Sequence, residues 1–466
     1  MKVISTLLVI LILAFALFPS CRKDKFISNS EAQLGLSADT LRFDTVFTTA
    51  GSITGSVKIY NTNQQRLRIN SISLAGGSAS AYRMNADGTA SSEVHDLELA
   101  AGDSLYVFVT VSINPNSARM PFLVRDSLIV RYGTQESKVQ LEAYGQNAHF
   151  LRQAVIGTDE VWNNDLPYVI LGALQVDTGV TLKIKKGTRI YCHADGAIIV
   201  DGTLKAEGTL KDSIVFRGDR LDEGYRDLPA SWPGIFFRSS SRQNMLTHVR
   251  ILNAYQGIVA DGPSNDAAPK IELRECVIDN CYNAGIIGYH SSIHARNCLI
   301  SNCGSNIELA AGGDYHFQHC NSASYSTLFA IHDKPVLLVT NWDSINNQLV
   351  TWPIQVLFEN CIFWGGQGTV DDEVIISRKG TDIWSAKMDH SLYKSRTDPM
   401  DTDLINCLKN EDPLFDNIDV GKMIFDFHLT KNPSPALNKG IPSDVIMDLD
   451  DQPRSAIPDI GCYQKQ

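Results

Sequence analysis

The sequence predicts an all-β protein in which a β-sandwich precedes a parallel β-helix. In residues 34–147, apolar and polar residues alternate in runs that Gly, Asn and Asp interrupt, which is typical of an antiparallel sandwich. From residue 150 onward the strands shorten and one phrase recurs at a fixed step, as RECVIDNC at 274–281 and RNCLISNC at 296–303. A repeat of this length, made of short strands, indicates a stack of parallel coils.

The chain begins with the features of a secretory signal. One lysine precedes an apolar run over residues 3–18, so we expect residues 1–20 to be a signal peptide. The residues up to Cys21 resemble the lipobox of bacterial lipoproteins, although Phe18 and Pro19 replace its usual residues. The resemblance implies cleavage before Cys21 and a lipid on its sulfur, which would attach the protein to a membrane. The alternative is a plain signal peptide followed by a chance cysteine.

Residues 21–33 are polar and without periodicity, so we expect a short tether. The Lys-Asp pair in CRKDKF (21–26) resembles the export tag of Bacteroidetes lipoproteins, with Lys25 where such tags usually carry a second acid. This resemblance implies an outer-membrane lipoprotein that is exposed at the cell surface.

Composition excludes several classes of protein. The chain has 466 residues, of which 44% are apolar and 20% charged, so it is long enough for two or more domains with large cores. Its net charge is −11, which gives no electrostatic case for binding nucleic acid. Beyond residue 20 no segment has the length and apolar character of a membrane span.

The predicted sandwich, residues 34–147, has inward-facing apolar residues in each run. They are Leu41, Phe43, Val46, Val57, Ile59, Leu67, Ile69, Ile72, Leu74, Leu105, Val107, Val109 and Val111. The phrases NTNQQRLRI, LAAGDSLYVFVTVSINP and VQLEAYGQ resemble, in that order, immunoglobulin-like domains of the ASPM/hydin type. The resemblance implies a spacer or a binding module without catalytic residues.

The predicted β-helix, residues 150–466, places like residues in columns. Cys276, Cys298 and Cys320 are evenly spaced, and Cys281 and Cys303 are separated by the same step. The interval from Cys320 to Cys361 is close to two such steps, which predicts nearly two turns. We expect these thiols to be reduced and packed in the core, because a buried free cysteine behaves as a small hydrophobe. We expect Asn280 and Asn302 to lie in a bend and to form hydrogen bonds along the stack.

The end of the chain carries a second resemblance. FENCIFWGG (358–366), EDPLFDN (411–417), FDFHLTKNPSPALNKGI (425–441) and DLDDQPRSAIPDIGCYQ (448–464) occur in this order. The series resembles the C-terminal part of right-handed parallel β-helix proteins of the pectin-lyase-like group, with Cys462 and Gln464 where alanine and glutamate are usual. The resemblance implies the fold for residues 150–466. It does not choose among lyases, hydrolases, adhesins and binding proteins.

Candidate chemistry lies on an outward stripe beside the cysteine columns. Its members are Glu272, Arg274, His294, Arg296 and His316, with Gln318 next in the Arg column. Such a stripe could grip an acidic glycan or supply a general base. The alternative is an ordinary solvated face of the solenoid, whose outward residues must be polar.

Two further groups have a functional and a structural interpretation. Asp448, Asp450 and Asp451 have a spacing suited to Ca²⁺, but in this turn they would also form local hydrogen bonds and an ion pair with Arg454. Exposed tryptophans near 333–390 could stack on sugars, or could cover the core; they are Trp342, Trp352, Trp364 and Trp384.

The sequence thus predicts a surface lipoprotein that binds a glycan or a partner protein through its β-helix. The alternative is a polysaccharide lyase or hydrolase acting on acidic, uronate-containing glycans, and a third interpretation is a purely structural surface component. No cofactor is required by these patterns, and calcium is the one cofactor that they leave open.

Overall fold

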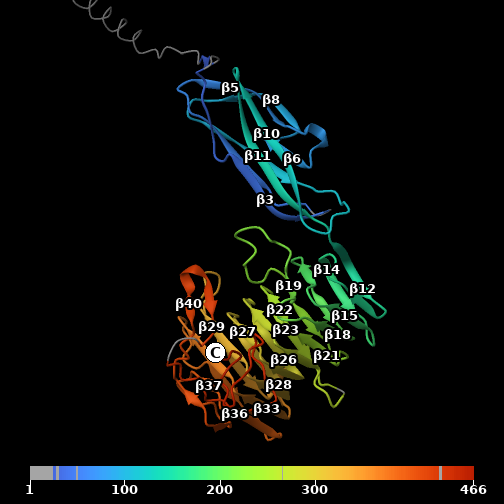
Figure 1. Ribbon diagram of the computed structural model, residues 1–466, viewed down its shortest axis with the longest axis vertical. Coiled ribbons are helices and arrows are strands. Elements are labelled where there is room, and N and C mark those ends of the chain that lie inside the picture. The colour runs from blue at the N-terminus through green and yellow to red at the C-terminus, as the bar shows by residue number, and fades with distance from the viewer. Residues whose placement is uncertain (1–24, 28–30, 49–50, 265, 430–432, 466) are drawn as a thin grey trace, which may run out of the picture. The chain divides into compact units, whose positions relative to one another are not determined.

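The computed structural model describes residues 25–27, 31–48, 51–264, 266–429 and 433–465 (Figure 1). The expected signal peptide and Cys21 lie outside the described residues. The chain divides into two compact units between Asn147 and Ala148. Among the described residues the regular structure is strands and two short 3-10 helices, η1 (Gly77–Ala79) and η2 (Val420–Lys422). None of the described helices could span a membrane. The all-β fold class is confirmed.

The first unit is an immunoglobulin-like sandwich of two sheets. One sheet has the order β1-β5-β10-β11-β3 with β8 paired to β5, and contains β1 (Phe26–Ile27), β3 (Thr40–Phe47), β5 (Arg66–Leu74), β8 (Glu93–Leu99), β10 (Phe122–Tyr132) and β11 (Gln135–Gln146). The other, here the β4–β9 sheet, has the order β2-β4-β9-β6-β7 and contains β2 (Leu34–Leu36), β4 (Gly55–Asn61), β6 (Tyr82–Ala86), β7 (Thr89–Ala90) and β9 (Ser104–Val111).

Alternation along the strands builds the core of this unit. In β9, Leu105, Val107, Val109 and Val111 are all buried, since successive side chains of a strand point to opposite faces of its sheet. Phe26 and Ile27 of the expected tether (21–33) add a short parallel strand beside β5.

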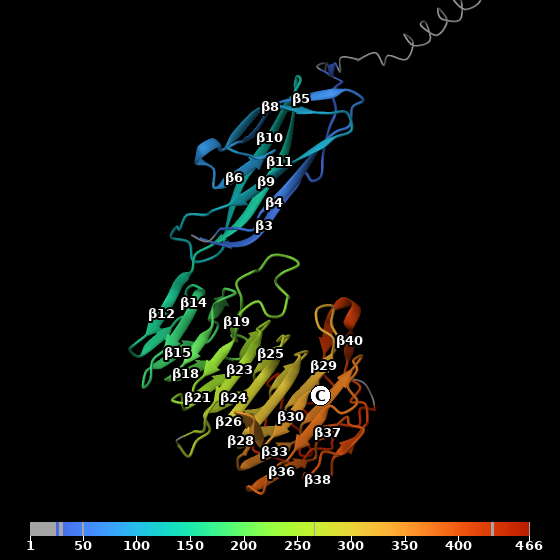
Figure 2. The same ribbon diagram turned by 180° about the vertical axis from the view of Figure 1, so that it is seen from behind.

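The second unit is a parallel β-helix of 26 strands, drawn from green to orange in Figures 1 and 2. Its coils run in turn through three parallel sheets, here called faces 1, 2 and 3. Face 1 contains β13 (Glu160–Trp162), β15 (Thr181–Lys185), β18 (Thr203–Glu207), β21 (Asn244–Thr247), β24 (Ile271–Arg274), the second halves of β26 (Ala284–Arg296) and β28 (Ser305–Gln318), β33 (Ile354–Glu359), β36 (Trp384–Asp389) and β38 (Asp403–Ile405).

Faces 2 and 3 complete each coil. Face 2 contains the first halves of β12 (His149–Ile156) and β14 (Tyr168–Val176), then β16 (Arg189–Cys192), β19 (Ile214–Gly218), β22 (Val249–Leu252), β25 (Val277–Asp279), β27 (Leu299–Ser301), β29 (Asn321–Tyr325), β34 (Ile362–Gly366), β37 (Leu392–Tyr393) and β39 (Leu408–Lys409). Face 3 contains the second halves of β12 and β14, β17 (Ile198–Val200), β20 (Ile235–Phe237), β23 (Gln256–Asp261), the first halves of β26 and β28, β30 (Leu337–Thr340) and β35 (Val374–Ser377).

The step between the cysteines of one column corresponds to one coil. Ile271 pairs with Ile293, and Ile278 pairs with Ile300, as the step predicts. The interpretation of residues 320–361 as nearly two turns is wrong, because Asn321 pairs directly with Ile362. This coil is lengthened by a loop over residues 326–336 and by the hairpin β31 (Trp342–Ile345) and β32 (Gln348–Thr351), so the whole interval makes a single turn.

Single left-handed residues turn the chain at each corner of the coil, and between faces 3 and 1 they include Gln243, His290 and Ala311. At the corner between faces 2 and 3 they are Asn253, Asn280 and Asn302, with φ of 61°, 56° and 50°. At the corner between faces 1 and 2 they are His248, Glu275, Asn297, His319, Asn360, His390 and Asn406. Asparagine suits these positions because its short polar side chain tolerates the left-handed conformation. The expectation that Asn280 bonds along the stack is confirmed, since its Nδ2 donates to Oδ1 of Asn253 at 2.9 Å.

The cysteine columns lie just inside these corners. Every cysteine in the described part of the chain is a free thiol, and only Cys407 is partly exposed. Cys276, Cys298 and Cys320 belong to one apolar core with their isoleucine and leucine neighbours. Their sulfurs donate weakly to backbone carbonyls, for example from Cys298 to Arg296 at 3.2 Å.

The C-terminal segment returns along the outside of face 2. Outward apolar residues of that face, including Leu299, Ile362 and Leu392, pack with Phe427 and Ile460 in one buried cluster. The corner asparagines fasten the segment. Asn297 Nδ2 donates to the Met447 carbonyl at 2.7 Å, and Asn360 Nδ2 donates to that of Ile441 at 2.9 Å. The C-terminal sequence motifs therefore have a structural role, which is to cover face 2. The hairpin β40 (Asn417–Asp419) and β41 (Ile424–Asp426) projects from this segment.

Candidate functional site

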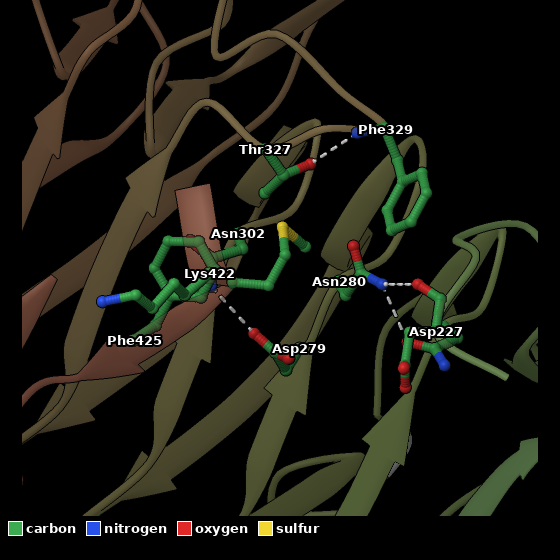
Figure 3. Close-up of a pocket in the computed structure, with 10 residues that line it drawn as sticks. Asp227, Asp279, Asn280, Asn302, Thr327, Phe329, Lys422 and Phe425 are labelled. Carbon is green, nitrogen blue, oxygen red and sulfur yellow. Dashed lines mark hydrogen bonds between the residues drawn. The ribbon is translucent and has the colours of Figure 1, made fainter. Parts of the chain in front are cut away.

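A groove of about 370 Å³ lies at the corner between faces 2 and 3 (Figure 3). Four parts of the second unit line it: the loop before β20, the asparagine corner, the 326–336 loop, and the β40–β41 hairpin. The lining residues are Asp227, Asn253, Asp279, Asn280, Asn302, Thr327, Phe329, Lys422, Met423 and Phe425. Its volume falls within the roughly 300–1,000 Å³ of typical small-molecule sites.

The floor of the groove is a ladder of side-chain amides. Asn280 Nδ2 donates to Oδ1 of Asn253 and also to the Asp227 carbonyl, at 2.9 and 2.8 Å. Asn253 Nδ2 donates to the Arg226 carbonyl at 2.7 Å. The ladder therefore holds both the corner and the neighbouring loop. Figure 3 shows the side-chain oxygen of Asn280 pointing away from these bonds and toward the space of the groove.

The carboxyl group of Asp279 belongs to the floor and has a perturbed pKa. Burial raises its pKa above the usual range, against the opposing effect of hydrogen bonds from Ser301 and Asn302. Ser301 Oγ donates to Asp279 Oδ1 at 2.6 Å, and Asn302 Nδ2 donates to the same oxygen at 3.2 Å. Asp227, which lines the same groove, is exposed and pairs with Arg226 at 3.2 Å. The groove thus contains two carboxyl groups in contrasting environments.

Apolar side chains form the two walls. Figure 3 shows Phe425 and Phe329 on opposite sides of the floor. Phe425 lies on β41 of the hairpin, and Met423 is the left-handed residue directly before that strand, with φ of 55°. Phe329 is 39% exposed in the 326–336 loop, which also exposes Leu328 and Ile331. A polar floor between two aromatic rings can take a flat ligand that has many hydroxyl groups.

The predicted stripe on face 1 is brought together in register but does not form a cleft. Glu272, His294 and His316 pair in sequence, as do Arg274, Arg296 and Gln318. The hollow that Glu272, Arg274, His294 and Arg296 line together measures about 40 Å³. That volume is far below the roughly 300 Å³ of small ligand sites.

Most charges of the stripe are already paired. Arg274 lies 2.6 Å from Glu272, Arg296 lies 2.7 Å from Asp444, and His316 Nε2 lies 2.7 Å from Glu359. Burial lowers the pKa of His294, which favours its neutral form. These contacts are those of a solvated face with local ion pairs, the alternative that the sequence left open.

The three aspartates proposed for Ca²⁺ make separate contacts. Asp448 accepts the backbone N–H groups of Asp450, Gln452 and Gln464 at 2.8–2.9 Å, which uses both of its oxygens. Asp450 pairs with His428 at 2.7 Å, and Asp451 lies 3.9 Å from His248. Arg454 donates to Asn297 rather than to these carboxylates. Across the described residues, no group of three or more His, Cys, Asp and Glu side chains is arranged to hold a metal ion.

The four tryptophans do not form one platform. Trp364 is buried in the cluster under the C-terminal segment. The Trp342 ring is covered by Lys379, whose Nζ lies 3.2 Å from its centroid, and Trp384 donates to the Asp401 carbonyl at 2.6 Å. Trp352 lies 5.7 Å from the His290 ring.

Sequence reasoning missed most of the groove. It identified Asn280 and Asn302 as corner residues, but not Asp227, Asp279 or the two phenylalanines as partners. One signal was available, because the long interval between Cys320 and Cys361 marks an insertion. Insertions on a solenoid often gather on one binding face.

These observations define a class: a two-unit, all-β protein with an immunoglobulin-like sandwich and a parallel β-helix that carries a groove at one corner. No family model matches the chain, and neither does any curated protein.

Three solved structures show limited likeness to the chain. They are a family 123 glycoside hydrolase from Clostridium perfringens (9% identity, TM-score 0.19, 25% of this chain and 30% of that one), a protein of unknown function from Porphyromonas gingivalis W83 (11%, 0.19, 27% and 60%), and PapD-like domain 7 of human CEP192 (9%, 0.18, 25% and 85%). The chain therefore spans less than a third of the hydrolase. At these scores the likenesses do not bear on activity.

Proposed function

We propose that this protein binds a glycan in the groove between faces 2 and 3, at the surface of the cell that makes it. The observation that carries the proposal is the amide ladder between Phe329 and Phe425, with Asn280 at its centre. Sugars present hydroxyl groups at their edges and apolar C–H groups on their faces. A site that binds them therefore combines fixed polar groups with aromatic walls.

Binding should be tested with the chain from residue 22 onward, which retains every described residue. Isothermal titration against uronate-containing and neutral oligosaccharides would give affinities for the parent chain, Asn280→Ala and Phe425→Ala. We expect at least one oligosaccharide to bind, and each substitution to weaken it about tenfold.

Asn406→Ala is the matched control. Asn406 is also a left-handed corner asparagine whose side chain forms a hydrogen bond to the preceding coil. It lies at the corner between faces 1 and 2, away from the groove. Equal affinity in the parent chain and Asn280→Ala, or an equal loss in Asn406→Ala, would contradict the proposal.

Glycoside hydrolysis is a second candidate function, favoured by the two carboxyl groups of the groove. A carboxyl group with a raised pKa, as in Asp279, suits a general acid, and the exposed carboxyl group of Asp227 would be the second member of the pair. Release of reducing ends should then vanish in Asp279→Asn, while binding persists. Full release by that variant would exclude the assignment.

The proposed location rests on the lipobox resemblance at Cys21. Metabolic labelling with a fatty acid in the native host would place a label on the parent chain and not on Cys21→Ala. Protease treatment of intact cells would then distinguish the outer from the inner side of the membrane. Labelling that survives the substitution would refute lipidation at this residue.

A further inference from the structure

The outer surface of the β4–β9 sheet, in the first unit, carries three exposed aromatic residues. Tyr60 is 36% exposed, Tyr106 48% and Phe108 47%. Outward positions of an antiparallel sandwich are normally polar because they face water. The inner face of β9 already supplies the core through Leu105 and the valines that alternate with the aromatic residues. Packing of this unit therefore gives no reason for aromatic rings on the outside.

The rings are ordered along two neighbouring strands. Tyr106 and Phe108 stand on the same side of β9, with centroids 5.9 Å apart and planes at 14°. Lys58 lies opposite Tyr106 on β4, and its Nζ is 5.1 and 5.3 Å from the centroids of Tyr60 and Tyr106. Within about 6 Å, such a cation is attracted to the ring faces. The surface therefore presents a positive charge at one end of two nearly parallel rings.

The surroundings of Phe108 leave its ring accessible. Its neighbours in register are Ser56 on β4 and Asn85 on β6, both shorter side chains. An aromatic ring flanked by short polar groups is suited to a ligand that stacks on the ring and forms hydrogen bonds at its edges.

The size of the patch favours a small ligand over a protein. An aromatic side chain offers about 150–250 Å² in all, so three rings exposed by less than half present roughly 300 Å². A stable protein interface buries about 800 Å² on each partner. The ammonium of Lys58 adds a charge that selects an anionic group.

We propose that Lys58, Tyr60, Tyr106 and Phe108 form a second carbohydrate-binding surface, specific for an acidic sugar. The apolar face of the sugar ring stacks on Phe108 and Tyr106, and its carboxylate or sulfate group pairs with Lys58. This surface lies in a different unit from the groove and does not depend on it.

The test uses the chain from residue 22 onward with Asn280→Ala, so that binding in the groove is weakened and contributes little to the measured affinity. Saturation-transfer NMR and titration calorimetry would follow an oligogalacturonate, a chondroitin sulfate oligosaccharide and a neutral cello-oligosaccharide. We expect one of the acidic ligands to bind, the double variant Tyr106→Ala/Phe108→Ala to weaken it at least tenfold, and Lys58→Gln to weaken it while reducing its salt dependence.

Tyr144→Ala is the control, because Tyr144 is 51% exposed on the other sheet of the same unit. The proposal is overturned if neither acidic ligand binds, if the double variant binds as the parent does, or if Tyr144→Ala has the same effect. Equal affinity for the neutral ligand would overturn the specificity for acidic sugars. The proposal for the groove is tested separately, by comparing the affinity of the parent chain with that of Asn280→Ala.

Discussion

His332 Nε2 lies 2.9 and 3.0 Å from the two carboxylate oxygens of Glu373, and both side chains are buried from solvent. His332 belongs to the 326–336 loop and Glu373 precedes β35, so the pair ties the wall of the groove to the coil. Gly365 closes over it, because a Cβ at that position would overlap Glu373 Oε1.

Glu373→Ala should destabilise the protein and weaken glycan binding together. Removing one partner of a buried hydrogen bond costs about 1–3 kcal/mol, since the His332 ring is left without its partner. Urea unfolding and calorimetric titration would measure the two effects. Asp371→Ala is the control: its pair with Arg396 is 76% and 80% exposed, so its loss should change stability by at most about 1 kcal/mol. Equal stability of the two variants would contradict this role of the buried pair.

Two substitutions at Asn280 distinguish the contribution of its backbone conformation to stability from that of its side-chain amide. Asn280→Ala loses the hydrogen bonds of the side-chain amide. It also places alanine in the left-handed conformation, at φ of 56°, and this second effect costs about 1–2 kcal/mol. Asn280→Gly loses only the amide, at about 1 kcal/mol. Chemical denaturation should therefore rank the parent above Asn280→Gly and the latter above Asn280→Ala, while both variants lose glycan affinity. A glycine variant that binds normally would show that the amide does not contact the ligand.

Asp279 should make stability depend on pH in a defined direction. Its folded pKa is raised by burial, so at low pH both states hold the proton, and as pH rises the unfolded state ionises first. Stability is therefore lost as pH rises from the unfolded value, about 3.9, toward the higher folded one.

Asp279→Asn keeps the acceptor for Ser301 and cannot ionise. Relative to the parent chain, it should gain stability progressively above about pH 4 and gain none below it. Unfolding curves recorded at several pH values would measure the difference. A difference that is constant with pH would mean that Asp279 does not titrate abnormally.

The thiols of the core should be inert in the folded protein. All of them except Cys407 are buried out of reach of a reagent, and burial also raises the pKa of Cys298 well above its usual range, so that its nucleophilic thiolate is scarce. In the chain from residue 22 onward, a water-soluble thiol reagent should modify Cys407 first and the remaining cysteines only on unfolding. Mass spectrometry of tryptic peptides would identify the sites. Rapid modification of Cys298 under native conditions would contradict the packed column.

Calcium should have little effect on the C-terminal turn. Asp448 already accepts three backbone N–H groups, so binding a cation would require these bonds to break. We expect the same melting temperature in millimolar Ca²⁺ and in chelator. Asp448→Ala should lower it, because those N–H groups would lose their acceptor. A melting temperature that rises with Ca²⁺ in the parent chain and not in Asp448→Ala would restore the metal interpretation.

Much of the architecture was predictable because a solenoid places residues one repeat apart in direct contact. The fixed step between the two cysteine phrases predicted the pairing of Ile271 with Ile293 and the stacking of Cys276 under Cys298. Strand alternation likewise identified Val107 and Val109 as core residues of the sandwich. In each case a local period in the sequence is a neighbour relation in space.

Only the tertiary structure decided where the chain could bind a ligand. Asp227, Asn280, Phe329 and Phe425 share no period, and they meet because a loop, a lengthened coil and a late hairpin converge on one corner. The Arg and His stripe, by contrast, has a clear period and proved to be largely paired with its own neighbours. A repeat in the sequence determines the stack, whereas the irregular segments that shape a groove are placed by long-range packing that leaves no periodic trace.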